Sequence, residues 1–402
     1  MLKLNILIGL VFILSSVKGL QIEHEISNSI ASESGSKISK IVEGYPFEEY
    51  EVTTPDEYIL KVIRISGSPN SPPSYGKTVV FLQHGLLSSS ADWLVLGRNK
   101  ALAYLLADQG YDVWLGNARG NTLSRKHQYL SPNRRDFWDF SWHQIGQIDL
   151  PAMIDFVLLN TGQKNLHYIG HSQGTTAFFV MASLRTEMNA KIKTMQAFAP
   201  VAFMSNLASP FLRIVAPFAD SIDTVMSMLG VYEFLPSNEM LVKGGQLICK
   251  DESPIQEVCA NVLFLIGGFN SPQLNRTIIP AILENTPAGS SVDQLVHYAQ
   301  GINSGKFRMF DFGLTKNLFK YGSIFPPDYK LSSVTAPVFL HYSNNDWLAA
   351  LKDVNELKGK LGNVRGEYFV PDMKFNHLDF IFATDADILV YNRAIDVIAN
   401  NL

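Results

Sequence analysis

Apolar and polar residues along the chain first follow a β pattern. Residues 49–52 and 58–65 carry alternating and β-branched side chains, and a turn signal at residues 54–56 separates them, which predicts a hairpin. The next run, residues 78–82, is almost continuously apolar, as expected for a strand buried on both faces of a parallel sheet. We therefore expect the central sheet to begin at this run.

From residue 99 onward, predicted helices and strands alternate. Alternation at this spacing is typical of βαβ units, in which helices cover a mostly parallel sheet, so the predicted fold class is α/β. The pattern predicts strands at residues 112–115, 166–169, 194–198, 338–342 and 367–370, and helices at residues 99–109 and 149–161, from residue 175 onward, and at residues 386–399.

Residues 204–327 interrupt this alternation. Within them, residues 212–235 are apolar with few charges, and the breakers Pro217 and Gly230 favour several short helices over one long helix. We interpret residues 204–327 as an insertion that caps the carboxyl edge of the sheet, with the core formed by residues 20–203 and 328–402. A segment as apolar as residues 212–235 is expected to fold down over the protein in water, because permanent exposure would favour aggregation.

Composition narrows the class of protein. Apolar residues make up 47% of the 402 residues and charged residues 17%, so a large core can be buried and a disordered chain is excluded. The net charge of −4 lacks the basic footprint of a nucleic-acid binder, so nucleic acid is not an expected partner. The oligomeric state is left open.

The first 19 residues have the pattern of a secretory signal peptide. Residues 4–14 are apolar apart from Asn5, Lys3 precedes them, and small or polar residues follow up to Gly19, the expected cleavage point. An uncleaved anchor is the alternative, but the run is shorter than the roughly 20 residues of a transmembrane helix, and no second candidate follows. The mature chain is therefore expected to be secreted or delivered to the lysosomal lumen.

An oxidising compartment changes the interpretation of the two cysteines. Cys249 and Cys259 are expected to form one disulfide, with two free buried thiols as the alternative. Asn275, followed by Arg276 and Thr277, begins the one N-glycosylation sequon we find, which lies at the surface if it is used.

Residues 170–174, with the sequence GHSQG, match the G-x-S-x-G nucleophile elbow. The pentapeptide alone is a weak signal, but a predicted strand leads into it and a predicted helix leaves it, which is the context that the elbow requires. Ser172 is thus the candidate nucleophile. The neighbouring His171 is expected to pack, because adjacent side chains diverge on such a turn.

A serine nucleophile needs a base, which a carboxylate must orient, in the chain order Ser, Asp, His for this fold. His377 is the candidate base because it lies in a loop after a strand, whereas His297 lies in the insertion and His341 inside a strand. Asp346 is the candidate carboxylate because it directly follows the strand at residues 338–342. The rivals are Asp372 and Asp379, which share the loop of the base, and Asp353, which is expected in a helix.

The oxyanion of the intermediate needs two backbone N–H donors. One candidate donor is Gln173, which directly follows the nucleophile. The other is Leu86, in the His-Gly loop after the strand at residues 78–82, although that loop could alternatively be an ordinary glycine turn. No metal-ligand spacing, P-loop or G-x-G-x-x-G cluster occurs, so neither a metal nor a cofactor is expected.

The sequence resembles the acid lipase family, which includes gastric and lysosomal acid lipases. The resemblance implies an α/β-hydrolase core with a cap and a mobile lid, no cofactor, and hydrolysis of neutral lipid esters. By position it implies Ser172, Asp346 and His377 as the triad, Leu86 and Gln173 as oxyanion donors, and a Cys249 to Cys259 disulfide. The matching stretches are GYP (44–46), EYEV (49–52), QHGL (83–86), GYDVWLGN (110–117), RGNT (119–122), DLPA (149–152), GHSQGT (170–175) and NHLDF (376–380).

Two residues depart from the family pattern. Gly267 stands where members often carry a free cysteine, and Glu57 replaces a glycine that is common in the early hairpin. The predicted function is that of a serine ester hydrolase acting on triacylglycerols or sterol esters at a lipid–water interface. A carboxylesterase for small soluble esters and a non-catalytic lipid carrier are the alternatives.

Overall fold

The computed structural model describes residues 42, 44–218, 226, 228, 230–235 and 267–401. The chain divides into two compact units, residues 1–43 and 44–402, and apart from residue 42 the described residues belong to the second. The predicted signal peptide, Cys249 and Cys259 lie outside the described residues.

The second unit is built on a mostly parallel sheet with the strand order β1-β2-β4-β3-β6-β7-β10-β11, and β5 pairs with β2. Strands β1, β2 and β5 pair antiparallel, as does β2 with β4, whereas neighbours from β4 to β11 in this order are parallel. The strands are β1 (Phe47–Thr53), β2 (Tyr58–Ile65), β3 (Val79–Gln83), β4 (Asp112–Gly116), β5 (Lys126–His127), β6 (Leu166–His171), β7 (Ile192–Phe198), β10 (Val338–Tyr342) and β11 (Val364–Phe369).

Burial along the strands follows their hydrophobic pattern. Every residue of β3 is buried, as its apolar run predicted for a strand covered on both faces, and every residue of β4 and β6 is buried as well. The edge strand β11 instead alternates between half-buried and exposed residues. It begins at Val364, three residues before its predicted start, because Gly366 and Arg365 weaken the apolar signal there.

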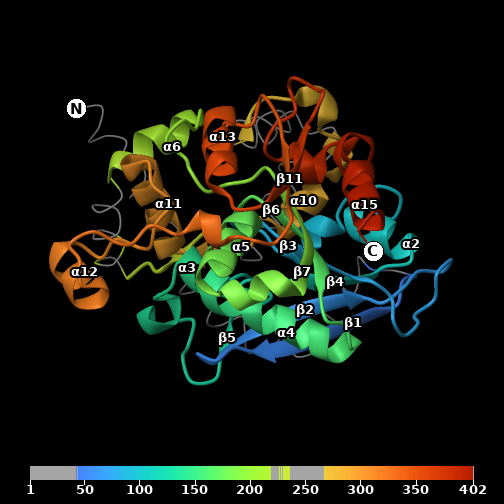
Figure 1. Cartoon of the computed structure of the whole chain (residues 1–402), viewed down its shortest axis with the longest axis horizontal. Coiled ribbons are helices and arrows are strands. Elements are labelled where there is room, and N and C mark those ends of the chain that lie inside the picture. The colour runs from blue at the N-terminus through green and yellow to red at the C-terminus, as the bar shows by residue number, and fades with distance from the viewer. Residues whose placement is uncertain are drawn as a thin grey trace. The chain divides into compact units, whose positions relative to one another are not determined.

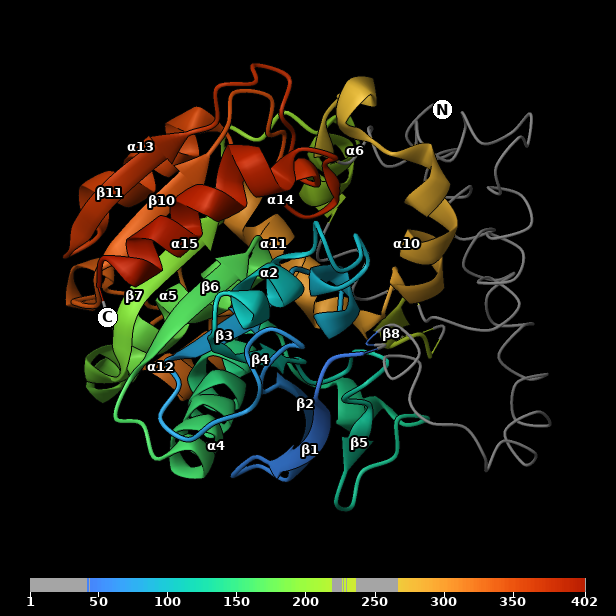
Figure 2. The same ribbon diagram turned by 90° about the vertical axis from the view of Figure 1, so that its right-hand side faces the viewer.

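Helices cover both faces of the sheet. Figures 1 and 2 show α2 (Leu102–Asp108) and α15 (Asn392–Ala399) on one face, and α4 (Leu150–Thr161) and α5 (Gln173–Leu184) on the other. A further helix, α13 (Leu351–Lys360), joins β10 to β11. The predicted closing helix is interrupted, since residues 387–391 form a π-helical turn before α15 begins.

The predicted hairpin is confirmed, with Thr53 of β1 opposite Ile59 of β2. Its turn places Glu57 at φ 71°, in the left-handed region that suits glycine. Behind it the buried Arg119 guanidinium is bonded to Asp56 and Asp149, at 2.6 Å from an oxygen of each. This network ties the hairpin to the core, because a buried charge is tolerated only when it is paired.

The described parts of residues 204–327 contain mostly short elements and one helix of 13 residues, α11. The first helix, α6, ends just before Pro217, and a 3-10 turn at residues 216–218 follows it. No described helix is long and apolar enough to cross a membrane. The elements are α6 (Pro210–Val215), β8 (Glu233–Phe234), α10 (Ile279–Asn285), β9 (Ser290–Ser291), α11 (Val292–Ser304) and α12 (Leu314–Tyr321), with β8 and β9 paired antiparallel.

Candidate active site

The nucleophile elbow lies between the end of β6 and the start of α5. Ser172 has φ 51° and ψ −115°, a conformation that costs energy for a residue with a side chain. Its N–H donates to Phe198 O at 3.0 Å, and its carbonyl accepts from Thr175 N at 2.9 Å. These bonds offset the strain and fix the direction of the Ser172 hydroxyl.

Both glycines of the elbow are needed for close packing. A Cβ atom on Gly174 would overlap the carbonyl oxygen of Gln83, which belongs to β3. A Cβ atom on Gly170 would lie 2.8 Å from the carbonyl carbon of Gly174, closer than real Cβ contacts allow. The G-x-S-x-G spacing therefore follows from the approach of β6, α5 and β3 at one point.

Three residues that are far apart in the sequence form a hydrogen-bonded chain. The Ser172 hydroxyl is 2.8 Å from His377 Nε2, and His377 Nδ1 is 2.9 Å from both carboxylate oxygens of Asp346. The Asp346 and His377 side chains are almost completely buried. Because the Asp346 carboxylate can only accept, it holds the proton of neutral His377 on Nδ1 and leaves Nε2 free to accept from Ser172.

The backbone that follows Asp346 orients its carboxylate. Asp346 Oδ1 accepts from the N–H groups of Leu348, at 2.9 Å, and Ala349, at 2.7 Å. Asp346 stands directly after β10, so the turn into α13 supplies these donors. The position at the carboxyl end of a parallel strand is the one the sequence predicted.

The remaining candidate bases have other partners. His171 Nε2 donates to the backbone carbonyl of His377 at 2.9 Å, and burial lowers the pKa of His171 to about 3. His341 is bonded to Gln196 within the sheet, at 2.7 Å. His297 is bonded to Ser141 at 2.9 Å and lies parallel to Trp142, with ring centres 3.5 Å apart. The structure brings none of the three to Ser172.

The rival carboxylates also lie apart from the imidazole of His377. Asp379 Oδ2 accepts from Asn376 N at 2.8 Å and Asn270 Nδ2 at 2.7 Å, and burial is the main reason that the Asp379 pKa is raised to about 7. Asp353, in α13 as predicted, accepts from the backbone N–H of Asn206 at 2.9 Å. Asp379 therefore fixes the turn that carries His377.

The loop after β3 lies directly against the elbow. A Cβ atom on Gly85 would be 3.2 Å from both the Ser172 Cβ and the His171 Nδ1. Among the described groups, we find no hydrogen-bond acceptor for the backbone N–H of Leu86 or of Gln173, the first residue of α5. Two backbone donors that lack an acceptor among the described groups, one next to the serine and one in the loop against the elbow, have the composition of an oxyanion hole.

Sequence reasoning missed the residues that hold this loop. His84 Nδ1 donates to Gly85 O at 2.7 Å, and its Nε2 accepts from Ala118 N at 3.1 Å. Asp92 is buried and bonded to Ser88 and, at 3.0 Å, to Thr286 of the insertion. The HGLLSSSAD run contained the signal, because Ser88 and Asp92 are four residues apart at a turn.

A second missed contact joins the insertion to the loops of the proposed acid and base. The carbonyl oxygen of Gly267 accepts from His377 N at 3.2 Å and from Trp347 N at 3.3 Å. A Cβ atom on Gly267 would lie 3.0 Å from the Leu378 side chain and 3.5 Å from His377 Cβ. Gly267, one of the two residues at which this chain departs from the family pattern, thus packs against His377.

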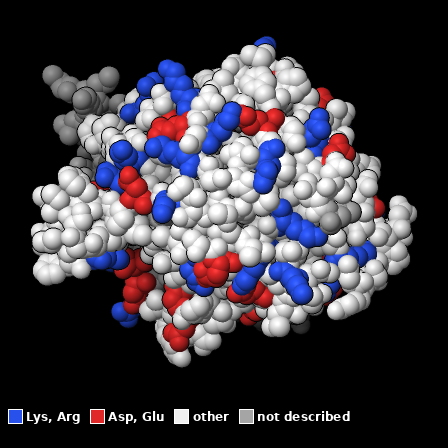
Figure 3. Space-filling model, in the orientation of Figure 1, with Lys and Arg blue, Asp and Glu red and all other residues white. Residues whose placement is uncertain are grey.

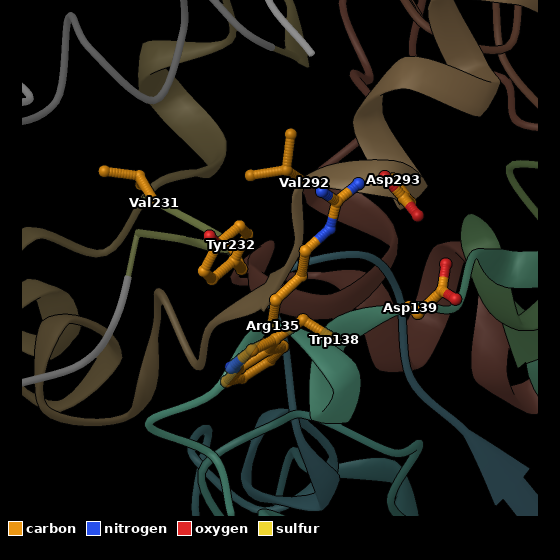
Figure 4. Close-up of a pocket in the computed structure, with 7 residues that line it drawn as sticks. All are labelled: Arg135, Trp138, Asp139, Val231, Tyr232, Val292 and Asp293. Carbon is orange, nitrogen blue, oxygen red and sulfur yellow. The ribbon is translucent and has the colours of Figure 1, made fainter. Parts of the chain in front are cut away.

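Two other features lie outside this cluster. Asn275 is exposed and caps a short 3-10 helix, with its Oδ1 2.8 Å from the Thr277 hydroxyl. A small pocket between residues 135–139 and the β8 and α11 region contains no serine, cysteine or histidine (Figure 4). Within the described ranges, no three His, Cys, Asp or Glu side chains are grouped as metal ligands.

The sheet order, with a strained serine between β6 and α5, defines an α/β hydrolase. Two family models match, a partial α/β-hydrolase lipase region at residues 38–97 and the α/β-hydrolase fold at residues 78–225. A hypothetical protein of Pseudomonas aeruginosa has a similar fold, with a TM-score of 0.56 at 10% identity over 92% of this chain and 98% of that one.

Relatives narrow the class further. The chain is 45% identical to Lipase 3 of Drosophila melanogaster, over 90% of this chain and 92% of that one. It is 41% identical to gastric triacylglycerol lipase of Rattus norvegicus (92% and 93%) and 38% identical to lysosomal acid lipase/cholesteryl ester hydrolase of Homo sapiens (92% of each). The chain belongs to the acid lipase family. The predicted fold, family and class of enzyme, a carboxylic ester hydrolase, are confirmed.

Proposed function

We propose that the chain hydrolyses acyl esters of neutral lipids, triacylglycerols or sterol esters, with Ser172 as the nucleophile, His377 as the base and Asp346 as the orienting carboxylate. The observation that carries the assignment is the ordered hydrogen-bond chain from the Ser172 hydroxyl through both nitrogens of His377 to Asp346. The substrate class rests on the names of the relatives, which include a triacylglycerol lipase and a cholesteryl ester hydrolase.

Acylation begins when Ser172 Oγ attacks the ester carbonyl carbon and its proton passes to His377 Nε2. The negative charge that forms on the carbonyl oxygen is stabilised by the backbone N–H groups of Leu86 and Gln173. Collapse of the intermediate breaks the ester C–O bond, and His377 returns the proton to the departing alkoxide. The products of this half-reaction are an alcohol and an acyl group on Ser172.

Deacylation repeats these steps with water. His377 Nε2 takes a proton from the water molecule, whose oxygen attacks the acyl carbon, and the proton then goes to Ser172 Oγ. A carboxylic acid leaves and the enzyme is regenerated. Asp346 remains ionised throughout and stabilises the transient imidazolium.

The backbone N–H groups of Leu86 and Gln173 stabilise the oxyanion in both half-reactions. A single oxyanion donor typically contributes a factor of about 100 to 1,000 in rate.

The insertion at residues 204–327 is proposed to be the cap, and the lipid–water interface its working environment. Contacts support the assignment of the cap, since Gly267 and Thr286 from these residues bond to the loops that carry His377, Asp346 and Leu86. Apolar residues between 212 and 235 supply the surface that would cover an ester with long acyl chains.

Export is part of the proposal. Cleavage near Gly19 would release the enzyme to the secretory pathway, where Cys249 and Cys259 would pair and the exposed Asn275 could carry a glycan. Peptide mapping without reduction should yield one cross-linked pair of peptides. Two thiols that react with an alkylating reagent in the native, unreduced protein would contradict the disulfide.

One hydrolysis panel tests the function. Wild type and Ser172→Ala are compared on triacylglycerol, cholesteryl ester and a short-chain soluble ester, each at acid and neutral pH. The proposal expects hydrolysis of at least one lipid ester and none by the variant. Activity confined to the soluble ester, with no gain on emulsification, would indicate a carboxylesterase. Lipid binding without turnover would indicate a carrier.

A further inference from the structure

The helix α12 has its apolar side chains turned away from the protein. Leu314 is 65% exposed, Leu318 53% and Phe319 87%, whereas the one buried residue of the helix is Asn317. A surface helix of a globular protein normally does the reverse, burying its apolar residues and exposing its polar ones. The arrangement needs a cause that holds the polar residue inside.

Hydrogen bonds of Asn317 provide that cause. Its Nδ2 donates to Asp311 Oδ1 at 2.7 Å and to the carbonyl of Ile324 at 3.0 Å, and its Oδ1 accepts from Phe312 N at 2.9 Å. These bonds fix α12 against the chain on both sides of it. Because Asn317 fixes the rotation of the helix, Leu314, Leu318 and Phe319 each remain more than half exposed.

The loop after the helix extends the apolar surface. Ile324 is 47% exposed and Phe325 59%, and the bond from Asn317 keeps the backbone of Ile324 beside α12. We refer to Leu314, Leu318, Phe319, Ile324 and Phe325 as the α12 patch. In Figure 1 α12 projects from the body of the protein, and Figure 3 shows this projection as mostly uncharged surface.

The charged side chains of α12 itself are both positive. The helix contains Lys316 and Lys320 and no acidic residue, in a chain whose net charge is −4; Asp311 precedes it and is bonded to Asn317, and Asp328 follows the loop after it. Both lysines are exposed, and Lys320 Nζ lies 4.0 Å from the centre of the Phe312 ring, next to the helix. A short basic helix with an outward apolar face has the composition of helices that lie in the plane of a lipid surface.

We propose that the α12 patch docks the enzyme on a lipid surface that carries anionic groups. Leu318 and Phe319 would enter the acyl layer, while Lys316 and Lys320 would stay among the head groups. The inference rests on the proposed function, because ester hydrolysis leaves carboxylic acids that add negative charge to the surface of the substrate. The patch thus provides an attachment point separate from the catalytic residues.

A binding experiment in the Ser172→Ala background tests the patch without forming product. The probes are vesicles of phosphatidylcholine alone and of phosphatidylcholine with phosphatidylglycerol, and the readout is co-sedimentation. The double substitution Leu318→Ser with Phe319→Ser should weaken binding to both kinds of vesicle by about tenfold or more. The double substitution Lys316→Glu with Lys320→Glu should weaken binding mainly to the anionic vesicles.

Matched controls use surface residues that lie outside the insertion at residues 204–327. Leu159→Ser with Ile388→Ser removes two apolar side chains that are 83% and 64% exposed, and Lys164→Glu with Lys352→Glu reverses two exposed charges. These variants should bind vesicles as the parent does. Equal losses in the control and patch variants would overturn the proposal, because binding would then be unspecific.

Other outcomes are also decisive. Unchanged vesicle binding by both patch variants would reject the docking surface, and a dimer that the same substitutions dissociate would identify the patch as a contact between copies. If the apolar variant lost its folded thermal transition, the lysine variant would carry the test. When the patch and control substitutions are made in the protein that keeps Ser172, turnover of a soluble ester should survive each of them. A failure of the docking proposal therefore remains distinct from a failure of the proposed chemistry.

Discussion

Two buried carboxylates lie near His377, and their surroundings differ. Asp346 faces the imidazole of His377 and two backbone N–H groups that follow it, whereas the donors to Asp379 among the described residues are the backbone N–H of Asn376 and the side-chain amide of Asn270. Both residues are less than 5% exposed. Their difference therefore comes from their partners and not from their burial.

The consequence is a division of tasks around one histidine. In the proposed reaction, Asp346 offers a negative charge to the imidazole of His377, which becomes positive when it accepts the proton of Ser172. The donors to Asp379 among the described residues, Asn376 and Asn270, are uncharged, and burial raises the pKa of Asp379 to about 7. Sequence position made both plausible; the direction of the side chains separates them.

The largest expected effect belongs to the nucleophile and the base. Ser172→Ala and His377→Ala should each lower kcat by at least about ten-thousand-fold, because either change removes the attacking oxygen or its proton acceptor. Steady-state hydrolysis of a soluble ester measures the loss, and circular dichroism checks that the variants fold. A folded variant that keeps a tenth of the wild-type rate would refute its assigned role.

The next effect contrasts the two carboxylates directly. Asp346→Asn should lower kcat by about ten-thousand-fold, since an amide can stabilise the wrong tautomer of His377 and cannot offset its charge. Asp379→Asn is the matched control, and it should retain most of the turnover because its oxygen still accepts from the Asn376 N–H. The opposite ranking of the two kcat values would assign the carboxylate role to Asp379.

Residues on regular elements could be predicted from the sequence. Strand β3 is a nearly continuous apolar run, β4 and β6 contain shorter apolar stretches, and the elbow glycines mark a backbone approach that leaves no space for a side chain. Ser172 and Asp346 followed because each directly succeeds a strand. Chain order then singled out His377, and the structure brings these three residues together.

The supporting contacts could not be predicted in this way. Gly267 and Thr286 reach the proposed catalytic loops across 80 or more residues of chain, and a single sequence holds no periodic signal for such contacts. The outward face of α12 was missed for a related reason. Its apolar spacing is that of a buried helix, and only the bonds of Asn317 reveal that the helix is rotated the other way.

A smaller effect is expected at His171, which supports the base from behind. His171→Phe keeps an aromatic ring but removes the N–H that donates to the carbonyl of His377, so kcat should fall about tenfold. His171→Gln, which restores a donor, should recover part of the loss. The control is His341→Phe, which breaks a buried bond to Gln196 in the sheet and should lower the melting temperature without changing kcat.

Equal losses of kcat in His171→Phe and His341→Phe would show that the rate follows general stability. A rise in KM with kcat unchanged would place His171 in substrate binding. Either result would remove His171 from the support of His377.

The smallest effect concerns stability and separates the two carboxylates by pH. The Asp379 pKa is about 7 in the folded protein and near 3.9 in an unfolded chain, so the folded state binds more protons between these values. The contribution of this carboxyl to the free energy of unfolding is therefore greatest below about pH 4 and is lost as the pH rises through about 7.

Asparagine does not titrate, so the free energy of unfolding of Asp379→Asn, relative to wild type, should rise by at most a few kcal/mol between pH 4 and pH 8. The buried histidines titrate in both proteins and cancel in the difference, which urea unfolding at several pH values measures. A difference that stays constant with pH would mean that folding does not raise the pKa of Asp379, which would contradict the prediction.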